Sequence, residues 1–324
     1  MSYGQDARVS ISFQNSYGTA NVASLHHMEP INESVTLAKA QITQKGLRGV
    51  YDKGQNQEGM NTVAGDILIE AKANQLGVLL HATNSIVTST TGTTSGTLYL
   101  HTFKPRTADH NPLSAEKPFT YLKFLGDTGS AHQYSDLNGS NLELSIANGE
   151  LLTAKMGIVG GSFARIAAVS ATYSVSNAID WSISSASCGG VALSGIKSLS
   201  ITQENNLQAK HMLDVDKFPA RIKRTDARVI SVSGTLAFDD QVEMNEFIAQ
   251  SDQRLFINLV GQSNVASGYP EILLIDIPSM RYTEFPVPIG GPGELEVSFK
   301  ADAQYNVGSA TAITYSLTCG KAGF

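Results

Sequence analysis

The stretch TVAGDILIEAKANQLGVLL, from Thr62 to Leu80, begins with the pattern of a strand and ends with that of a helix, with no proline or loop between them. Val63, Ile67 and Ile69 recur with the period of two that places side chains on one face of a strand. Beyond Lys72 the leucines recur with the period of a helix. A strand that leads directly into a helix is thus the first structural expectation for this chain.

A second stretch, SVSGTLAFDDQVEMNEFIAQ from Ser231 to Gln250, repeats this pattern. When Gly65 is aligned with Gly234, the apolar face of the first strand matches Val232, Leu236 and Phe238. Both stretches then continue with apolar residues at i, i+3 and i+4, which predicts one short amphipathic helix in each. The apolar faces of these flanking helices are Leu76, Leu79 and Leu80 in the first, and Met244, Phe247 and Ile248 in the second.

Two further pairs of segments match in the same order. SVTLAKAQIT (34–43) matches SLSITQENNL (198–207), and NGELLTAKM (148–156) matches PGELEVSFKA (292–301). Matches that keep their order indicate a duplication. The sequence therefore predicts a mainly β chain of two tandem sandwich or barrel domains, residues 1–180 and 181–324, each with one short flanking α-helix. The Ser/Thr/Gly-rich insertion at about 84–111 predicts an exposed hairpin or flexible loop.

Composition limits the possible functions. The 324 residues carry a net charge of −6, so the basic footprint of a protein that grips nucleic acid is absent. Cys188 and Cys319 are expected to be separate buried thiols of a reducing compartment. The N-terminus lacks the pattern of a signal peptide, and no apolar run has the length of a membrane span. We therefore expect a chain made in a cytoplasm, with no membrane partner.

The sequence offers little support for catalysis or metal binding. SDLNGSNLE (135–143) resembles a calcium loop only faintly, because its spacing is too short, and Asn138-Gly139 favours a hairpin turn. In HMLDVD (211–216), a charged loop is favoured over a cation site. The glycine clusters lack the Lys-Ser/Thr ending of a phosphate-binding loop. No Gly-x-Ser-x-Gly motif of a serine nucleophile lies beside a plausible strand-to-helix turn. We expect no enzymatic activity, no catalytic or metal residues and no cofactor.

Four motifs in this order resemble the major tail tube proteins of long-tailed, siphovirus-type bacteriophages, and in particular the family that carries two tube domains in one chain. The motifs are NTVAGDILIEAKANQLGVLLHA, LYLHTFKP (98–105), SDLNGSNLELSIANGELLTAKM and IKSLSITQENNLQA. The resemblance extends from about Ser34 to Tyr305. No single motif is diagnostic; the order and the duplication carry the similarity.

The resemblance implies a structural virion protein that polymerises into stacked rings, which form the hollow tail tube through which DNA passes during ejection. Its partners would be further copies of itself, with trimeric rings of pseudo-sixfold symmetry favoured over hexamers. A tape measure protein and DNA would occupy the lumen, and tail terminator and distal tail proteins would bind the tube ends. The protein would lie in the virion tail. The alternative is a carbohydrate-binding or adhesive β-sandwich module of a phage tail or fimbria, which the single tryptophan and sparse aromatic residues disfavour.

Two long polar loops, 44–61 and 208–228, are expected to stack one ring on the next. Each mixes charged residues with large apolar ones, as protein interfaces do, although an ordinary solvated loop is the alternative. The expected stacking residues are Leu47, Arg48, Tyr51, Asp52, Lys53, Met212, Asp214, Lys217, Phe218 and Arg221. The strand RVISVSGTLAF is expected to place Ile230 and Val232 in the core and Ser231 and Ser233 on the opposite face.

Overall fold

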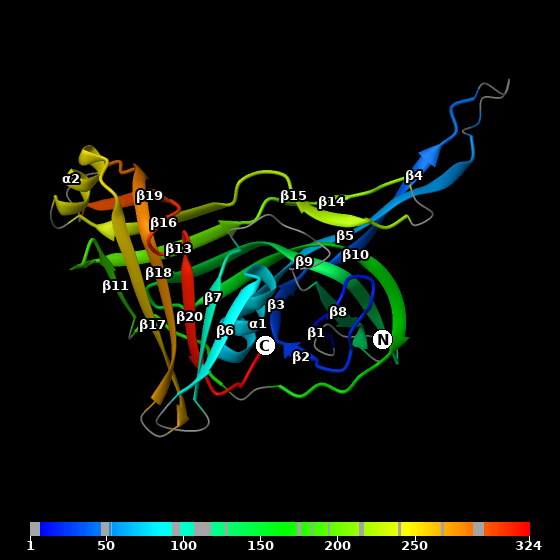
Figure 1. Cartoon of the computed structure of the whole chain (residues 1–324), viewed down its shortest axis with the longest axis horizontal. Helices are drawn as coiled ribbons and strands as arrows, with labels where there is room; N and C mark the ends of the chain where they lie inside the picture. Colours follow the sequence, from blue (N-terminus) through cyan, green and yellow to red (C-terminus); the bar gives the residue numbers. More distant parts are fainter. Residues whose placement is uncertain are drawn as a thin grey trace.

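The computed structural model describes residues 7–46, 52, 54–92, 98–106, 118–126, 129–173, 176–182, 184–193, 195–213, 217–238, 241–266, 269–287 and 295–324. Within these ranges the chain is mainly β, with two short helices and large antiparallel pairings (Figure 1). The expected fold class is confirmed. Neither helix is long and apolar enough to cross a membrane, within the described part of the chain.

The elements follow one another along the chain in two series. The first series is β1 (Arg8–Phe13), β2 (His26–Met28), β3 (Pro30–Glu33), β4 (Thr36–Thr43), β5 (Asn56–Glu70), α1 (Ala73–Thr83), β6 (Ile86–Thr91), β7 (Tyr99–Lys104), β8 (Phe119–Phe124), β9 (Ser130–Ala147) and β10 (Thr153–Ala167). The second series is β11 (Ser185–Cys188), β12 (Val191–Ala192), β13 (Ile196–Glu204), β14 (Leu207–Lys210), β15 (Arg221–Arg224), β16 (Val229–Ala237), α2 (Val242–Ala249), β17 (Gln253–Ala266), β18 (Tyr269–Glu284), β19 (Glu296–Ala303) and β20 (Thr314–Cys319).

One continuous run of antiparallel pairings crosses both halves of the chain, in the order β4–β5–β10–β9–β13–β16–β19–β18. Strands β8, β1 and β2 extend from β9 in the first half. Strands β17, β11 and β12 extend from β18 in the second half, in the same relation. The two halves of the chain therefore share one continuous sheet.

The alternating pattern of β5 and β16 explains the core. Val63, Ile67 and Ile69 are completely buried, while Asp66 and Leu68 between them are half-buried. In β16, Ile230 and Val232 are likewise buried, and the intervening serines face the other side. The faces expected from the sequence are confirmed in both strands.

Gly65 and Gly234 permit the same close approach in the two halves. A Cβ on Gly65 would lie 2.6 Å from the carbonyl oxygen of Ser34, and one on Gly234 would lie 2.5 Å from that of Ser198. Gly65 also has a φ of +154°, which L-residues rarely adopt. At both positions, therefore, the lack of a side chain allows a close backbone approach in mid-strand.

The two flanking helices differ in burial. In α1, Leu76, Leu79 and Leu80 are completely buried, so the whole apolar stripe serves the core. In α2, Met244 and Phe247 are only partly buried, and Ile248 is 66% exposed. The aromatic ring of Phe247 stacks on that of Phe285 at 6.3 Å between centroids. The second helix thus covers its sheet with a narrower contact.

The inserted segment forms the hairpin β6–β7, and residues 93–97 at its tip lie outside the described residues. Strand β7 pairs with β20, which in turn pairs with β18. The C-terminal Phe324 packs against α1, because a Cβ on Gly77 would lie 2.1 Å from its ring, and its ring centroid lies 4.8 Å from that of His101. The insertion in the first half is therefore held by the last strand of the chain.

Two sequence expectations are wrong in detail. Asn138-Gly139 is not a turn, because β9 continues through it; a Cβ on Gly139 would lie 2.6 Å from Thr83 Cγ2, so this glycine allows α1 to pack closely. The match between β10 and β19 is also shifted by three residues. Met156 lies opposite Ile67 and Val297 lies opposite Leu236. The similar Gly-Glu-Leu sequences before the two strands had hidden this register.

Replacement of Gly65 by alanine should destabilise the unassembled chain by about 3 kcal/mol, because the new Cβ meets backbone and the φ becomes strained. Denaturant unfolding monitored by circular dichroism measures this loss. Gly46→Ala is the matched control, since a Cβ at Gly46 has nothing within 4 Å. Equal midpoints for the two variants would contradict the close approach.

Candidate assembly interface

The junction between the halves is a strand pairing. The β13 strand of the second half pairs antiparallel with the end of β9, from Ser198 opposite Ala147 to Glu204 opposite Asn141. The N–H of Asn148 donates to the carbonyl oxygen of Lys197 at 2.9 Å. Since the hydrogen-bonding direction alternates along a strand, the odd-numbered residues of β13 direct their backbone groups at β9.

A buried amide closes this junction. Asn205 is 2% exposed, and its Nδ2 donates to the carbonyl oxygens of Thr83 and Gly139, each at 3.0 Å. Its Oδ1 accepts from Gln203 Nε2 at 3.1 Å and from Arg228 Nε at 2.8 Å. Asn205 therefore fixes the second half to both α1 and β9 of the first, with all four contacts inside the chain.

The counterpart of β13 in the first half has an open side. Within the described residues, β4 pairs only with β5. The N–H of Ser34 donates to the Asp66 carbonyl oxygen at 2.9 Å, so even-numbered residues in the first part of this strand point at β5. The N–H of Asn61, opposite Lys39, instead donates to Lys217 at 2.9 Å, which confirms that Lys39 directs its backbone groups away from β5.

The β14–β15 hairpin of the second half lies on the first half. Besides the Asn61–Lys217 bond, His211 Nε2 lies 3.0 Å from the Asn61 carbonyl oxygen. The Ile222 side chain is buried against Gly160, because a Cβ on Gly160 would lie only 2.5 Å from Ile222 Cδ1. Hydrogen bonds from Lys217, then from Asn61 and Lys39, lower the pKa of Glu58 to about 2. This hairpin is therefore seated on β5 and β10.

The predicted stacking residues fall into two groups. Asp52 is described and exposed, Met212 and Lys217 are exposed, and Phe218 and Arg221 are half-buried. The remaining predicted residues lie outside the described residues; they are Leu47, Arg48, Tyr51, Lys53 and Asp214. Leu213, one of the large apolar residues that the sequence places in the same loop, is fully exposed between the two contacts to Asn61.

Groups with catalytic potential are scattered. Within the described residues, no three His, Cys, Asp or Glu side chains stand close enough to hold a metal ion. Burial raises the pKa of Glu271 to about 7, and burial also raises the pKa of both cysteine thiols. Cys188 and Cys319 are free and buried, as expected. The buried carboxyl of Glu271 lies on β18, remote in sequence from the HMLDVD motif.

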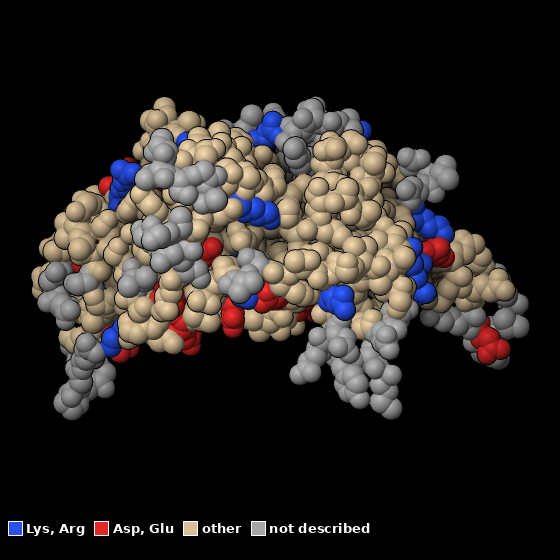
Figure 2. All heavy atoms as spheres, turned by 90° about the horizontal axis from the view of Figure 1, so that it is seen from below, with Lys and Arg blue, Asp and Glu red and all other residues tan. Residues whose placement is uncertain are grey.

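Among the described residues on the face drawn in Figure 2, the charged side chains form no continuous basic stripe. Lys and Arg side chains lie there singly or in small groups with Asp and Glu among them, and uncharged surface separates them. A continuous basic stripe would be needed to neutralise successive phosphates.

Asn205→Ala should cost about 2–4 kcal/mol of unfolding free energy, because it removes the donor that the carbonyl oxygens of Thr83 and Gly139 share and one acceptor each from Gln203 and Arg228. Thermal unfolding of the unassembled chain measures the loss. The exposed Lys223→Ala is the control, with an expected change within about 0.5 kcal/mol. If both variants unfold alike, the amide does not hold the junction.

Comparison with known proteins agrees with this architecture. No curated protein matches the chain. The family model described as phage tail tube protein matches residues 4–318, nearly the whole length. The match spans both series of strands, both helices and the junction between them. The chain therefore belongs to the phage tail tube protein family and has a structural role in the tail tube.

Proposed function

We propose that this chain polymerises head to tail into closed rings, which stack into the hollow tube that conducts phage DNA. The observation that carries the proposal is the contrast between two counterpart strands. The outer side of β13 is filled by β9 of the same chain, whereas no described strand pairs with the outer side of β4. An open edge with unpaired N–H and C=O groups is a template for another strand, and ring closure removes it.

The second half supplies a partner for this edge. Strand β18 corresponds to β9 in the order of pairings, and beyond Met280 it pairs, within the described residues, with β19 alone. In the proposed ring, this end of β18 lies beside β4 of the next chain, just as the end of β9 lies beside β13. Each junction between chains then repeats the junction inside the chain.

The proposal includes the duplication into residues 1–180 and 181–324. Two observations support the duplication: the strands of the two halves pair in the same order, and Ser34 approaches Gly65 as Ser198 approaches Gly234. If each half occupies one of six equivalent places, three chains complete a ring with pseudo-sixfold symmetry. Six chains per ring remain the alternative.

The hairpins extend the same symmetry. The β14–β15 hairpin is seated on β5 and β10, while the β4–β5 arm projects from the body (Figure 1). The β14–β15 hairpin contacts β5 at Asn61 and β10 at Gly160. When Gly65 is aligned with Gly234, the residues of the second half that correspond to these two are Ile230 and Ala301. A pocket of about 510 Å³ lined by Ile230 and Ala303 adjoins them. The arm of one chain would lie there on the second half of the next.

In the assembled tail, DNA and a tape measure protein would occupy the lumen, and tail terminator and distal tail proteins would bind the ends. The net charge of −6 favours passage of DNA over binding, because few cations are available to hold phosphates. The protein would act without catalysis or cofactor. An adhesive or carbohydrate-binding module is the second candidate, and it predicts a chain that remains monomeric at every concentration.

Lys39→Pro tests the open edge. Proline removes an N–H that points away from β5, so the subunit should stay folded while ring closure fails. Negative-stain microscopy and sedimentation measure assembly, and circular dichroism checks the fold. Lys39→Ala removes the same ion pair with Glu58 but keeps the N–H, so it should assemble normally. Normal rings from the proline variant would show that this edge is not used.

The mass of one isolated ring decides the stoichiometry. Native mass spectrometry should give three times the 34.5 kDa of the chain. Six times that mass would replace the pseudo-sixfold ring by a true hexamer.

A further inference from the structure

After β20 the last five residues, 320–324, leave the sheet and end beside α1 and β2 of the first half (Figure 1). We call these residues the C-terminal strap. Lys321 and Phe324 are half-buried, whereas Ala322 and Gly323 between them are exposed. A Cβ on Gly323 would have nothing within 4 Å. The strap is therefore held at two side chains rather than along its whole length.

The ring of Phe324 is the apolar anchor of the strap. It lies over α1 in a space that a glycine leaves open, because a Cβ on Gly77 would lie 2.1 Å from the ring. Its centroid lies 4.8 Å from that of His101 in an edge-to-face arrangement, and 5.9 Å from that of Phe103. Aromatic pairs at these separations attract one another. A single ring thus bridges α1 and β7.

The backbone of the strap is held by a neutral histidine. The carbonyl oxygen of Lys321 lies 2.7 Å from His101 Nε2. A carbonyl only accepts, so Nε2 carries the proton and Nδ1 accepts from the Ser89 hydroxyl at 2.8 Å. His101 is completely buried, and burial lowers its pKa. Both nitrogens of the neutral ring are thereby satisfied.

The amine of Lys321 makes a contact that depends on protonation. Its Nζ lies 2.7 Å from His26 Nδ1 on β2. An ammonium group has donors only, so this bond requires the lone pair of a neutral imidazole. The same Nζ lies 4.7 Å from the centroid of the Phe324 ring, which is a cation–π contact. Lys321 therefore joins the aromatic anchor to β2 as long as His26 is unprotonated.

The surroundings of His26 keep its ring neutral near pH 7. Burial, followed by the positive charges of Lys321, His81 and His27, lowers the pKa of His26 to about 4. Burial also lowers the pKa of Lys321, to about 8. Between these two values the ring is neutral and the amine is charged, which is the combination that the bond requires.

The other charged groups around β2 have partners of their own. Glu29 forms an ion pair with Lys72 at the start of α1. The ring of His27 lies 2.6 Å from Ser10 Oγ, and burial and then the charge of Arg8 lower its pKa. These groups leave the bond between His26 and the strap as the element that a proton would break.

We propose that the C-terminal strap is a pH-sensitive switch, which the neutral ring of His26 holds closed and which protonation of that ring opens. The imidazolium and the ammonium group would then face each other as like charges with donors only, and the amine of Lys321 would leave. Opening uncovers the Gly77 side of α1 and frees the bond to His101. The switch lies within one chain and acts independently of ring assembly.

The direction of the pH dependence follows from the two states. In the open state His26 is exposed and regains its ordinary pKa of 6.5, whereas the closed state holds the pKa at about 4. Protons therefore bind more tightly to the open state, and the closed state is lost as the pH falls. Between pH 7 and pH 4 the ratio of open to closed strap should rise about 100-fold.

A nitroxide label on Ala322→Cys reports the state of the strap. Ala322 is exposed, and the two native cysteines are buried, so the label attaches to the strap. Electron paramagnetic resonance should show an immobile label at pH 7 and a mobile one near pH 4. Phe324→Ala in the labelled chain supplies the spectrum of the open strap, and circular dichroism at each pH checks the fold.

His26→Asn separates the switch from a general effect of acid. The asparagine oxygen can accept from Lys321 but takes up no proton, so the label should stay immobile at pH 4. His27→Asn is the matched control, because His27 lies on the same strand but bonds Ser10, and this variant should keep the transition. The same transition in His26→Asn, or an immobile label at pH 4 in the chain with both histidines, would overturn the proposal. Loss of the fold at the pH that frees the label would overturn it too, since the strap would then have no transition of its own.

Discussion

The pairing of β9 with β13 is the interaction on which the rest of the structure depends. It turns two sheets into one and uses the edge that each half would otherwise expose. Asn205 reinforces it with a single amide that bonds one group each from α1, β9 and β13 and the guanidinium of Arg228. Such a network is favourable only when every member is paired, and here every atom of the amide has a partner.

This junction also explains the difference between the two hairpins. The β14–β15 hairpin is short and folded onto its neighbour because that neighbour is part of the same chain. The β4–β5 arm has the same origin in the sheet, and beyond the contacts of Glu58 and Asn61 with Lys217 its strands extend from the body. In the proposed ring, this asymmetry would reflect which contacts are internal and which are made with the next chain.

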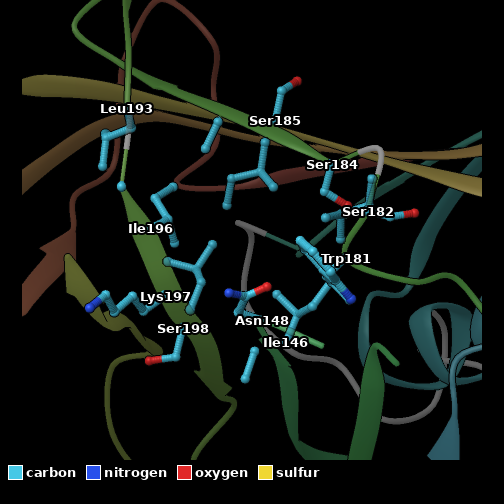
Figure 3. Close-up of a pocket in the computed structure, with 16 residues that line it drawn as sticks. Ile146, Asn148, Trp181, Ser182, Ser184, Ser185, Leu193, Ile196, Lys197 and Ser198 are labelled. Carbon is cyan, nitrogen blue, oxygen red and sulfur yellow. The ribbon is translucent and has the colours of Figure 1, made fainter. Parts of the chain in front are cut away.

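The strand and helix patterns could be predicted because they depend on local periodicity. Ile67 in β5 and Leu79 in α1 are buried as their spacing requires. Asn138-Gly139 could not, because a turn and a packing glycine use the same residue, and only the nearby Thr83 distinguishes them. The pocket of about 330 Å³ beside Trp181 (Figure 3) could not be predicted either, because its walls come from β9, β11, β13 and β17, which meet only in the folded chain.

The position of Phe324 has a consequence for biosynthesis. The last strand, β20, joins β18 to the β6–β7 hairpin, and the final residue packs on α1, which is made early. A nascent chain on the ribosome therefore lacks the segment that completes its first helix and hairpin. Folding of the first half therefore cannot finish before β20 and Phe324 have been synthesised and have left the ribosome.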